Sequence, residues 1–470
     1  MTRHILIFAV VVAIAGLPAI AVAKDYSHQE YFESYEGTST CLNCHEDEAR
    51  DFFHSEHYQW LGPTPDVVNS HGSEQGKLTM VNDFCTNPVP SWIGKITNDE
   101  GKVMASGCSK CHAGLGLMPS AEMSREQLEN IDCLICHASG YRRDVYQNDD
   151  GSWEWRSILW KNKEGLDSVS KRIGRPTNTQ CLRCHSASGG GPNFKRGDIE
   201  YTLDDPEPEF DVHMSTDGVG LACADCHSFT NHRVSGRGSD LVATDSAAGR
   251  LTCDNGMCHD SAPHAKALLN EHVKRVDCTV CHIPTFAQDE ATDVFRDWSD
   301  VHFSEEKGKF APKITAETEV VPTYAWYNGT SHMQMPMTPV ERNADGAVMM
   351  AIPQGSKDDP DARLAAFKVH RARLPVLDGK TWLLPITVDE LYVHGDVDRA
   401  VKEGTEKLYG IHDASFTWTD TIRYMKINHE VRPAAYALRC LDCHGPDGRL
   451  DWKAIGYNDG DPLAEVFAGR

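Results

Sequence analysis

The chain has 470 residues, of which 40% are hydrophobic, and its formal net charge is −23 at pH 7. This acidic balance argues against nucleic-acid binding, because nucleic-acid-binding domains carry basic surfaces. The length suggests two domains. A solvated acidic surface is the commonest reason for such a charge, and a cationic or cytochrome partner is consistent with it.

The first 23 residues resemble a secretory signal peptide. Arg3 and His4 precede an apolar run from Ile5 to Ile14, and residues 21–23 (AVA) form a small-residue cleavage pattern. A transmembrane anchor is the alternative, but the run is short for a membrane span. Cleavage would leave a mature chain with a net charge of −24, since Arg3 is lost with the signal.

Few regular elements are expected in the mature chain. The hairpin pattern lies around Trp153–Ile158, and the Gly-rich and Pro-rich runs at 188–192 and 235–239 predict loops. Helices are predicted, in chain order, at Glu46–Trp60, Ala121–Asn130, Ala265–Val276, Asp361–Arg371 and Tyr424–Ala437.

Cysteine spacing is the strongest signal in the sequence. Sixteen of the 17 cysteines form pairs, and a histidine directly follows each pair. Seven pairs read C-x-x-C-H, the attachment signature of c-type haem, in which two thiols bind the porphyrin and the next imidazole binds its iron. The predicted attachment cysteines are Cys41, Cys44, Cys108, Cys111, Cys133, Cys136, Cys181, Cys184, Cys223, Cys226, Cys253, Cys258, Cys278, Cys281, Cys440 and Cys443. The predicted iron ligands are His45, His112, His137, His185, His227, His259, His282 and His444.

Zinc sites, redox dithiols and disulfides also use paired cysteines, but none of them needs a histidine directly after the second cysteine. Chance would place a histidine there about one time in twenty, so eight in eight is not coincidence. The sixth pair, Cys253 and Cys258, has four residues between its cysteines. For this pair a disulfide in a glycine-containing turn remains the alternative to haem.

The density of motifs divides the chain. Seven motifs occur within the 242 residues from Cys41 to His282, and none occurs between Ile283 and Arg439. We therefore predict a haem-dense domain at 24–290 with haems 1–7 and a C-terminal domain at 291–470 with the eighth. The expected fold is a multihaem cytochrome c, mainly α, with extensive irregular chain wrapped around eight covalent haems and few strands.

Haems that only transfer electrons need a second axial ligand, and histidine is abundant enough to supply it. Of 23 histidines, eight lie in the motifs and His4 lies in the signal, so 14 remain. Seven haems with two histidines would leave one haem whose open side can bind substrate. The seven predicted second ligands are His57, His213, His232, His264, His272, His370 and His429.

Seven stretches resemble octahaem tetrathionate reductases, which are periplasmic proteins related to hydroxylamine oxidoreductase and cytochrome c nitrite reductase. The stretches are residues 55–60, 82–85, 171–176, 189–198, 211–214, 281–287 and 427–433. The resemblance extends from Cys41 to about Tyr457, which is nearly the whole mature chain. No C-x-x-C-K motif is present, which argues against the nitrite reductases that use one.

In that family the second haem has a histidine on one side and a lysine on the other, with an unattached cysteine nearby. The resemblance implies His112 and Lys171 as these two ligands and Cys85 as the cysteine. It also implies catalytic positions for Asn82, three residues before Cys85, and for Asp167, about one helical turn before Lys171.

The resemblance implies a periplasmic reductase of tetrathionate to thiosulfate at a lysine-ligated second haem, with nitrite and hydroxylamine as further substrates and a periplasmic or membrane-bound cytochrome as electron donor. The alternative is an electron conduit in which every haem has two histidine ligands. Hydroxylamine oxidation is a third interpretation, which no residue favours. Acidic loops would suit calcium, but none has a recognisable ligand spacing.

Overall fold

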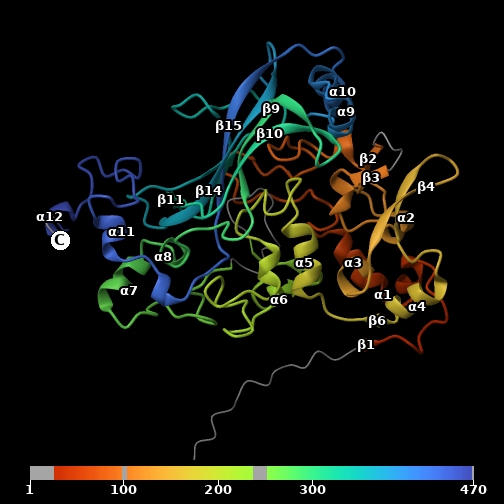
Figure 1. The fold of residues 1–470 in the computed structure, drawn as a ribbon, viewed down its shortest axis with the longest axis horizontal. Coiled ribbons are helices and arrows are strands. Elements are labelled where there is room, and N and C mark those ends of the chain that lie inside the picture. Colours follow the sequence, from red (N-terminus) through yellow and green to blue (C-terminus); the bar gives the residue numbers. More distant parts are fainter. Residues whose placement is uncertain (1–25, 98–102, 237–250, 468–470) are drawn as a thin grey trace, which may run out of the picture.

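The computed structural model describes residues 26–97, 103–236 and 251–467, which Figure 1 shows as coloured ribbon. The predicted signal segment lies outside these residues. Within the described ranges, no helix is both long enough and apolar enough to cross a membrane.

Five of the eight haem motifs lie on the short helices α3, α5, α6, α8 and α11, so that the motif histidine comes at or just after the helix end. The first motif lies inside the longer α1, which is kinked at His45, and the second motif begins in the 3₁₀ turn Cys108–Lys110. The helices are α1 (Thr38–Phe53), α2 (Arg125–Glu129), α3 (Leu134–His137), α4 (Lys163–Ser170), α5 (Asn178–His185), α6 (Cys223–Cys226), α7 (Ala267–Val273), α8 (Cys278–His282), α9 (Val388–His394), α10 (Val397–Tyr409), α11 (Cys440–His444) and α12 (Ala464–Phe467).

A seven-stranded sheet occupies the upper part of Figure 1, with the motif helices below it and to its left. Its order is β10-β9-β14-β15-β13-β12, with β11 also paired to β14. β14 pairs antiparallel with β15 and parallel with β9. The strands are β9 (Thr292–Ser304), β10 (Lys309–Glu317), β11 (Thr323–Tyr327), β12 (Ser331–Met333), β13 (Val348–Pro353), β14 (Arg363–Leu377) and β15 (Phe416–Lys426).

The expectation of a mainly α fold with few strands is wrong for the C-terminal half of the chain. The helix predicted at Asp361–Arg371 falls on β14. The helix predicted at Tyr424–Ala437 falls on the end of β15 and on the irregular chain after it. Residues 364–368 and 374–377 of β14 are buried without a break, whereas buried and exposed residues alternate between them. Since both faces are covered in the two end stretches, these stretches lack the apolar–polar alternation that marks a half-buried strand.

Other predicted elements agree better with the structure. The hairpin around Trp153–Ile158 is confirmed as β4 (Arg143–Gln147) paired with β5 (Trp153–Ser157). The helix predicted at Ala265–Val276 is the shorter α7. The remaining strands form two-stranded pairs, namely β1 (Tyr26–Ser27) with β6 (Arg172–Ile173), β2 (Gly94–Thr97) with β3 (Val103–Ser106), and β7 (Phe229–Thr230) with β8 (Arg233–Val234).

The largest apolar core joins the sheet to α9 and α10. Leu374 of β14, Leu391 of α9 and Val401 of α10 are buried together there. A loop from the haem-dense part of the chain ends against the same core, where Thr86 Oγ1 accepts the Ile386 N–H at 2.6 Å and Ser91 Oγ accepts the Val388 N–H at 3.0 Å. The sheet begins at Thr292, close to the predicted domain boundary near residue 290, and it supports the loop that carries Cys85.

Candidate functional site

Seven of the eight motif histidines face a histidine from elsewhere in the chain. The separations between ring centroids all lie between 6.1 and 6.4 Å. The pairs are His45 with His28 (6.2 Å), His137 with His232 (6.3 Å), His185 with His57 (6.1 Å), His227 with His429 (6.1 Å), His259 with His213 (6.2 Å), His282 with His264 (6.2 Å) and His444 with His272 (6.4 Å).

These separations fit a metal ion between the two rings. Two imidazoles that bind one ion from opposite sides, each at about 2 Å, place their ring centres roughly 6.3 Å apart. The second ring nitrogen is held as well: Nδ1 of His137, His227 and His444 bonds to Gly174 O, Ser235 O and Asp461 Oδ1, respectively, at 2.8–2.9 Å. Such bonds orient an imidazole toward a metal, so the residues fit haem iron.

Six of the seven histidines predicted as second ligands occupy these facing positions, and His370 does not. His370 is buried against Asp83, with Nδ1 2.7 Å from Asp83 Oδ2, and its ring stacks on Phe84 at 3.8 Å. The seventh facing histidine is His28, opposite His45. The sequence offered one clue to His28, namely its position shortly before the first motif.

Contacts between motif cysteines give the order of the motifs in space. The sulfur atoms lie close together in four pairs, namely Cys41 with Cys133, Cys111 with Cys184, Cys181 with Cys223, and Cys253 with Cys278. Cys136 also lies near Cys181, Cys226 near Cys258, and Cys281 near Cys440. The motifs therefore form a row from the first through the third to the eighth, from right to left in Figure 1, and the second motif lies beside the fourth.

His112 of the second motif is the exception. Among the described residues, it is the motif histidine that faces no second imidazole. Its ring is fully buried and lies against Tyr58, Trp60 and Trp92, at centroid distances of 4.9, 5.4 and 4.7 Å. Nε2 bonds to the Tyr58 carbonyl at 2.6 Å, and burial lowers the pKa of His112 to about 3. The second motif thus has an environment of its own.

Cys85 lies beside this second motif. The Cys85 thiol is within electrostatic reach of Cys108 and of Tyr392. Asn82 holds the turn that presents it, because Asn82 Oδ1 accepts the N–H of Phe84 at 3.0 Å and that of Cys85 at 3.5 Å. Cys85 is partly exposed.

Buried charges fasten the Cys85 loop to the sheet. Asp83 bonds to His370 of β14 and to Arg423 of β15, each at 2.7 Å, and its carbonyl accepts the Trp298 Nε1–H of β9 at 2.8 Å. Burial acts to raise the pKa of Asp83, but Arg423 and His370 outweigh it and hold this pKa well below its usual range. Three strands therefore fix the position of Cys85.

Lys171 and Asp167 lie elsewhere. Lys171 Nζ donates to the Glu33 carbonyl at 2.8 Å and sits 5.4 Å from the centre of the Phe32 ring, while Asp167 Oδ1 accepts the Tyr35 N–H at 2.7 Å. These contacts tie the end of α4 to the segment before the first motif. In Figure 1, α4 lies at the lower right, whereas β10 and α9 lie in the upper part. The structure does not bring Lys171 to Cys85.

The lysine near Cys85 is Lys309, the first residue of β10. Its Nζ lies 4.1 Å from the centre of the Tyr392 ring, and the charge of Cys85 acts on it. Sequence reasoning missed Lys309 because no motif surrounds it and 223 residues separate it from Cys85. Only the packing of β10 against α9 brings the two together.

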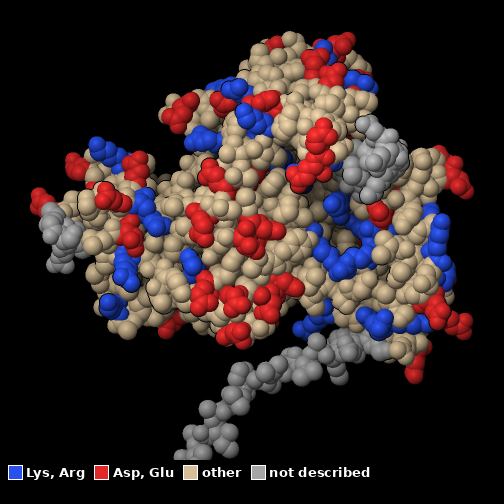
Figure 2. All heavy atoms as spheres, in the orientation of Figure 1, with Lys and Arg blue, Asp and Glu red and all other residues tan. Residues whose placement is uncertain are grey.

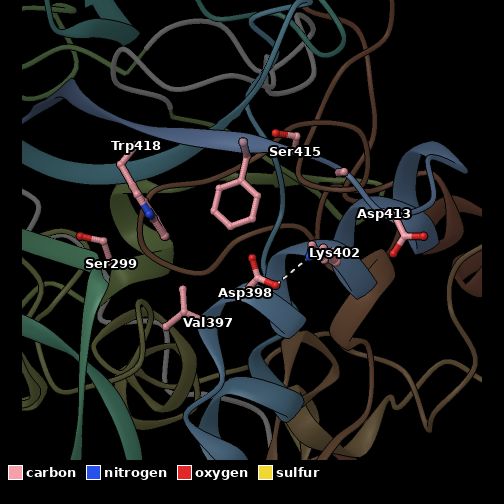
Figure 3. A pocket seen from close by; sticks show the side chains of 9 residues that line it. Ser299, Val397, Asp398, Lys402, Asp413, Ser415 and Trp418 are labelled. Atoms are coloured by element: carbon pink, nitrogen blue, oxygen red, sulfur yellow. Dashed lines mark ion pairs between the residues drawn. The ribbon is translucent and has the colours of Figure 1, made fainter.

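A cavity of about 480 Å³ lies away from the motifs, between α10 and β15. Figure 3 shows Asp398 and Lys402 at its wall, joined by an ion pair of 2.8 Å, with Trp418 opposite. Phe416 also lines the cavity. It contains no motif residue and no thiol. The described residues also contain no group of three or more His, Cys, Asp or Glu side chains arranged for a metal ion, so the calcium expectation gains no support.

Comparisons with known proteins agree with the haem assignment. A family model for bacterial cytochrome c matches residues 282–447. An uncharacterized protein of Archaeoglobus fulgidus is 36% identical over 293 residues, which cover 52% of this chain and 95% of that protein. The solved structure of an octaheme cytochrome c from Shewanella oneidensis matches with a TM-score of 0.73 and 28% identity, over 91% of this chain and 94% of that chain. These comparisons support a place for the chain among the multihaem cytochromes c, and they imply covalent haem as its cofactor.

Proposed function

We propose that the protein is a periplasmic octahaem reductase whose reaction takes place at the second haem motif, with tetrathionate as the first candidate substrate. The observation that carries this proposal is the asymmetry at His112. Seven motif histidines have a facing histidine, whereas His112 has none within the described part of the chain and has the Cys85 thiol near its motif. An iron with one protein ligand can bind substrate, which distinguishes a reductase site from an electron carrier.

The motif cysteines and the histidine pairs would hold the haems, which would supply electrons one at a time. The chain arranges their attachment sites in a continuous row, with the second motif reached through the fourth at Cys111 and Cys184. A periplasmic or membrane-bound cytochrome is the proposed electron donor. Export by the segment at 1–23 would agree with haem attachment outside the cytoplasm.

Cys85 gives the site its sulfur chemistry. We infer that its thiolate attacks a central sulfur of tetrathionate, that the central S–S bond breaks, and that one thiosulfate leaves with the bonding pair. The chain then carries Cys85–S–S–SO₃⁻. Two electrons from the reduced donor break the new S–S bond, restore the thiolate and release the second thiosulfate. The cycle consumes no net proton.

The function is tested by oxidation of a reduced viologen dye, with tetrathionate, nitrite and hydroxylamine added in separate assays. Turnover with tetrathionate at two electrons per molecule and without proton uptake supports the proposal. Turnover with the nitrogen compounds alone would move the function to nitrogen reduction. No turnover with any of the three compounds, in a protein whose haems can still be reduced and reoxidised completely, would indicate an electron conduit.

Replacing His28 with alanine is expected to convert one ferric haem from two-histidine low-spin to high-spin, because His28 is the residue that faces His45. Electron paramagnetic resonance of the oxidised holoprotein measures this as the loss of one of seven such signals. His412→Ala is the matched control, since His412 is exposed and pairs only with Glu406 in the described chain. An unchanged spectrum in the His28 variant would contradict the pairing.

A further inference from the structure

Positive charge gathers around Cys85, although the chain as a whole carries a net charge of −23. The amine of Lys309 lies within the electrostatic reach of Lys307, Lys110 and Arg296 as well as of Cys85. Figure 2 shows Lys and Arg side chains around a hollow in the right half of the view, below the place of the β2–β3 hairpin in Figure 1. A concave cationic region on an acidic protein attracts small anions and raises their local concentration.

The position of Lys309 is fixed by the contact between β10 and α9. Gly395, at the end of α9, has a φ of 68°, and a Cβ there would lie 2.5 Å from the Phe310 ring. The helix end therefore packs directly on the residue after Lys309. Tyr392, one turn earlier on α9, supports the lysine amine at 4.1 Å, in a cation–π geometry. This packing holds the amine within electrostatic reach of the Cys85 thiol.

The lysines of this cluster are free to bind a ligand, whereas Arg296 is not. Arg296 pairs with Asp293 at 2.7 Å and donates to the carbonyls of Phe84 and Gly189. Among the described residues, no hydrogen bond or ion pair engages the Lys309 amine or the Lys110 amine. Burial lowers the pKa of Lys309, and Lys307 adds to this effect. A bound anion would relieve the mutual repulsion of these cations.

We propose that Lys309, supported by Lys307 and Lys110, forms an anion-binding subsite beside the Cys85 thiol for small sulfur oxyanions. A sulfonate end held at Lys309 would bring the adjoining sulfur atoms toward the thiol, and the same charge would stabilise the departing thiosulfate. The sulfur oxyanion as ligand rests on the proposed function. The anion site itself does not, and it can be tested without turnover.

The test compares two alkylating reagents on the oxidised holoprotein. Iodoacetate is an anion and iodoacetamide is neutral, and Cys85 is the one cysteine outside the haem motifs. The rate of Cys85 alkylation, followed by peptide mass spectrometry, gives the ratio of the two rate constants. Lys309→Gln is expected to lower this ratio at least about threefold, the effect of one charge some 6 Å away in water. Added salt should lower it in the wild type as well.

Two variants serve as controls. Lys309→Arg keeps the charge and should retain the ratio. Lys274→Gln removes an exposed lysine that pairs with Glu271 on α7 and should leave the ratio unchanged. An equal ratio in the wild type and Lys309→Gln, or a Cys85 that reacts with neither reagent, would overturn the proposal. A lowered ratio without tetrathionate turnover would keep the anion site and refute tetrathionate as its substrate.

Discussion

Replacing Cys85 with serine is expected to lower the rate of tetrathionate reduction at least about a thousandfold, because a hydroxyl at neutral pH cannot replace the thiolate as nucleophile toward sulfur. Serine is close to cysteine in size, and Cys85 forms no haem bond in our assignment, so haem content should be unchanged. Viologen oxidation measures the rate of tetrathionate reduction. The number of electrons taken up in a reductive titration shows whether the haem content is unchanged.

The comparison of substrates within this variant separates the two possible roles of the second motif. If Cys85 acts covalently, tetrathionate turnover fails while any reduction of nitrite or hydroxylamine, which needs no thiol, persists. Loss of all activities with intact haems would indicate that the residue shapes the site instead. Tetrathionate turnover at the wild-type rate would rule out the covalent role of Cys85.

Replacing Asp83 with alanine is expected to destabilise the protein by about 3–5 kcal/mol, the usual cost of leaving buried charges without their partner. Asp83 and His370 are fully buried, and Arg423 is 2% exposed. Denaturant unfolding of the holoprotein, followed by circular dichroism, measures the difference in free energy. Because the same contacts hold the Cys85 loop, the variant should also lose tetrathionate turnover.

The matched control lies on the same two strands. Asp420→Ala removes the partner of Arg373 in an exposed pair between β15 and β14, where the expected cost is below about 1 kcal/mol. Equal effects of the two substitutions would contradict the role assigned to burial.

The pH dependence of the Asp83 contribution has a definite sign. The pKa of Asp83 is lower in the folded protein than its ordinary value of about 3.9. The stability that its charge contributes is therefore fully present above about pH 4 and is lost as the pH falls further. The difference between the wild type and Asp83→Ala should shrink below pH 4, and a difference that grew on acidification would refute this assignment.

The sequence by itself determined the predicted sites of haem attachment, because that chemistry is local. Two thiols and an imidazole within a few residues suffice, so each motif is visible without knowledge of the fold. The count of histidines also led to the expectation of one exceptional haem, and the structure places His112 without a facing histidine. Cys85 could be singled out in the same way, as the cysteine left over from the pairs.

Only the tertiary structure decided which distant residues meet. His232 faces His137 across 95 residues, and His370 resembles the other candidates in sequence but is buried in an ion-pair network with Asp83. Lys171 matched a family pattern and yet lies by Glu33, while Lys309 is brought to Cys85 by the packing of β10 on α9. The strand β14 was not predicted because burial on both faces of its two end stretches removes the alternation that would reveal a strand there. Haem attachment depends on residues that are neighbours in sequence. The pairing of histidines, the positive charge near the Cys85 thiol and the strand order of the sheet depend instead on long-range packing, which no local sequence pattern predicts.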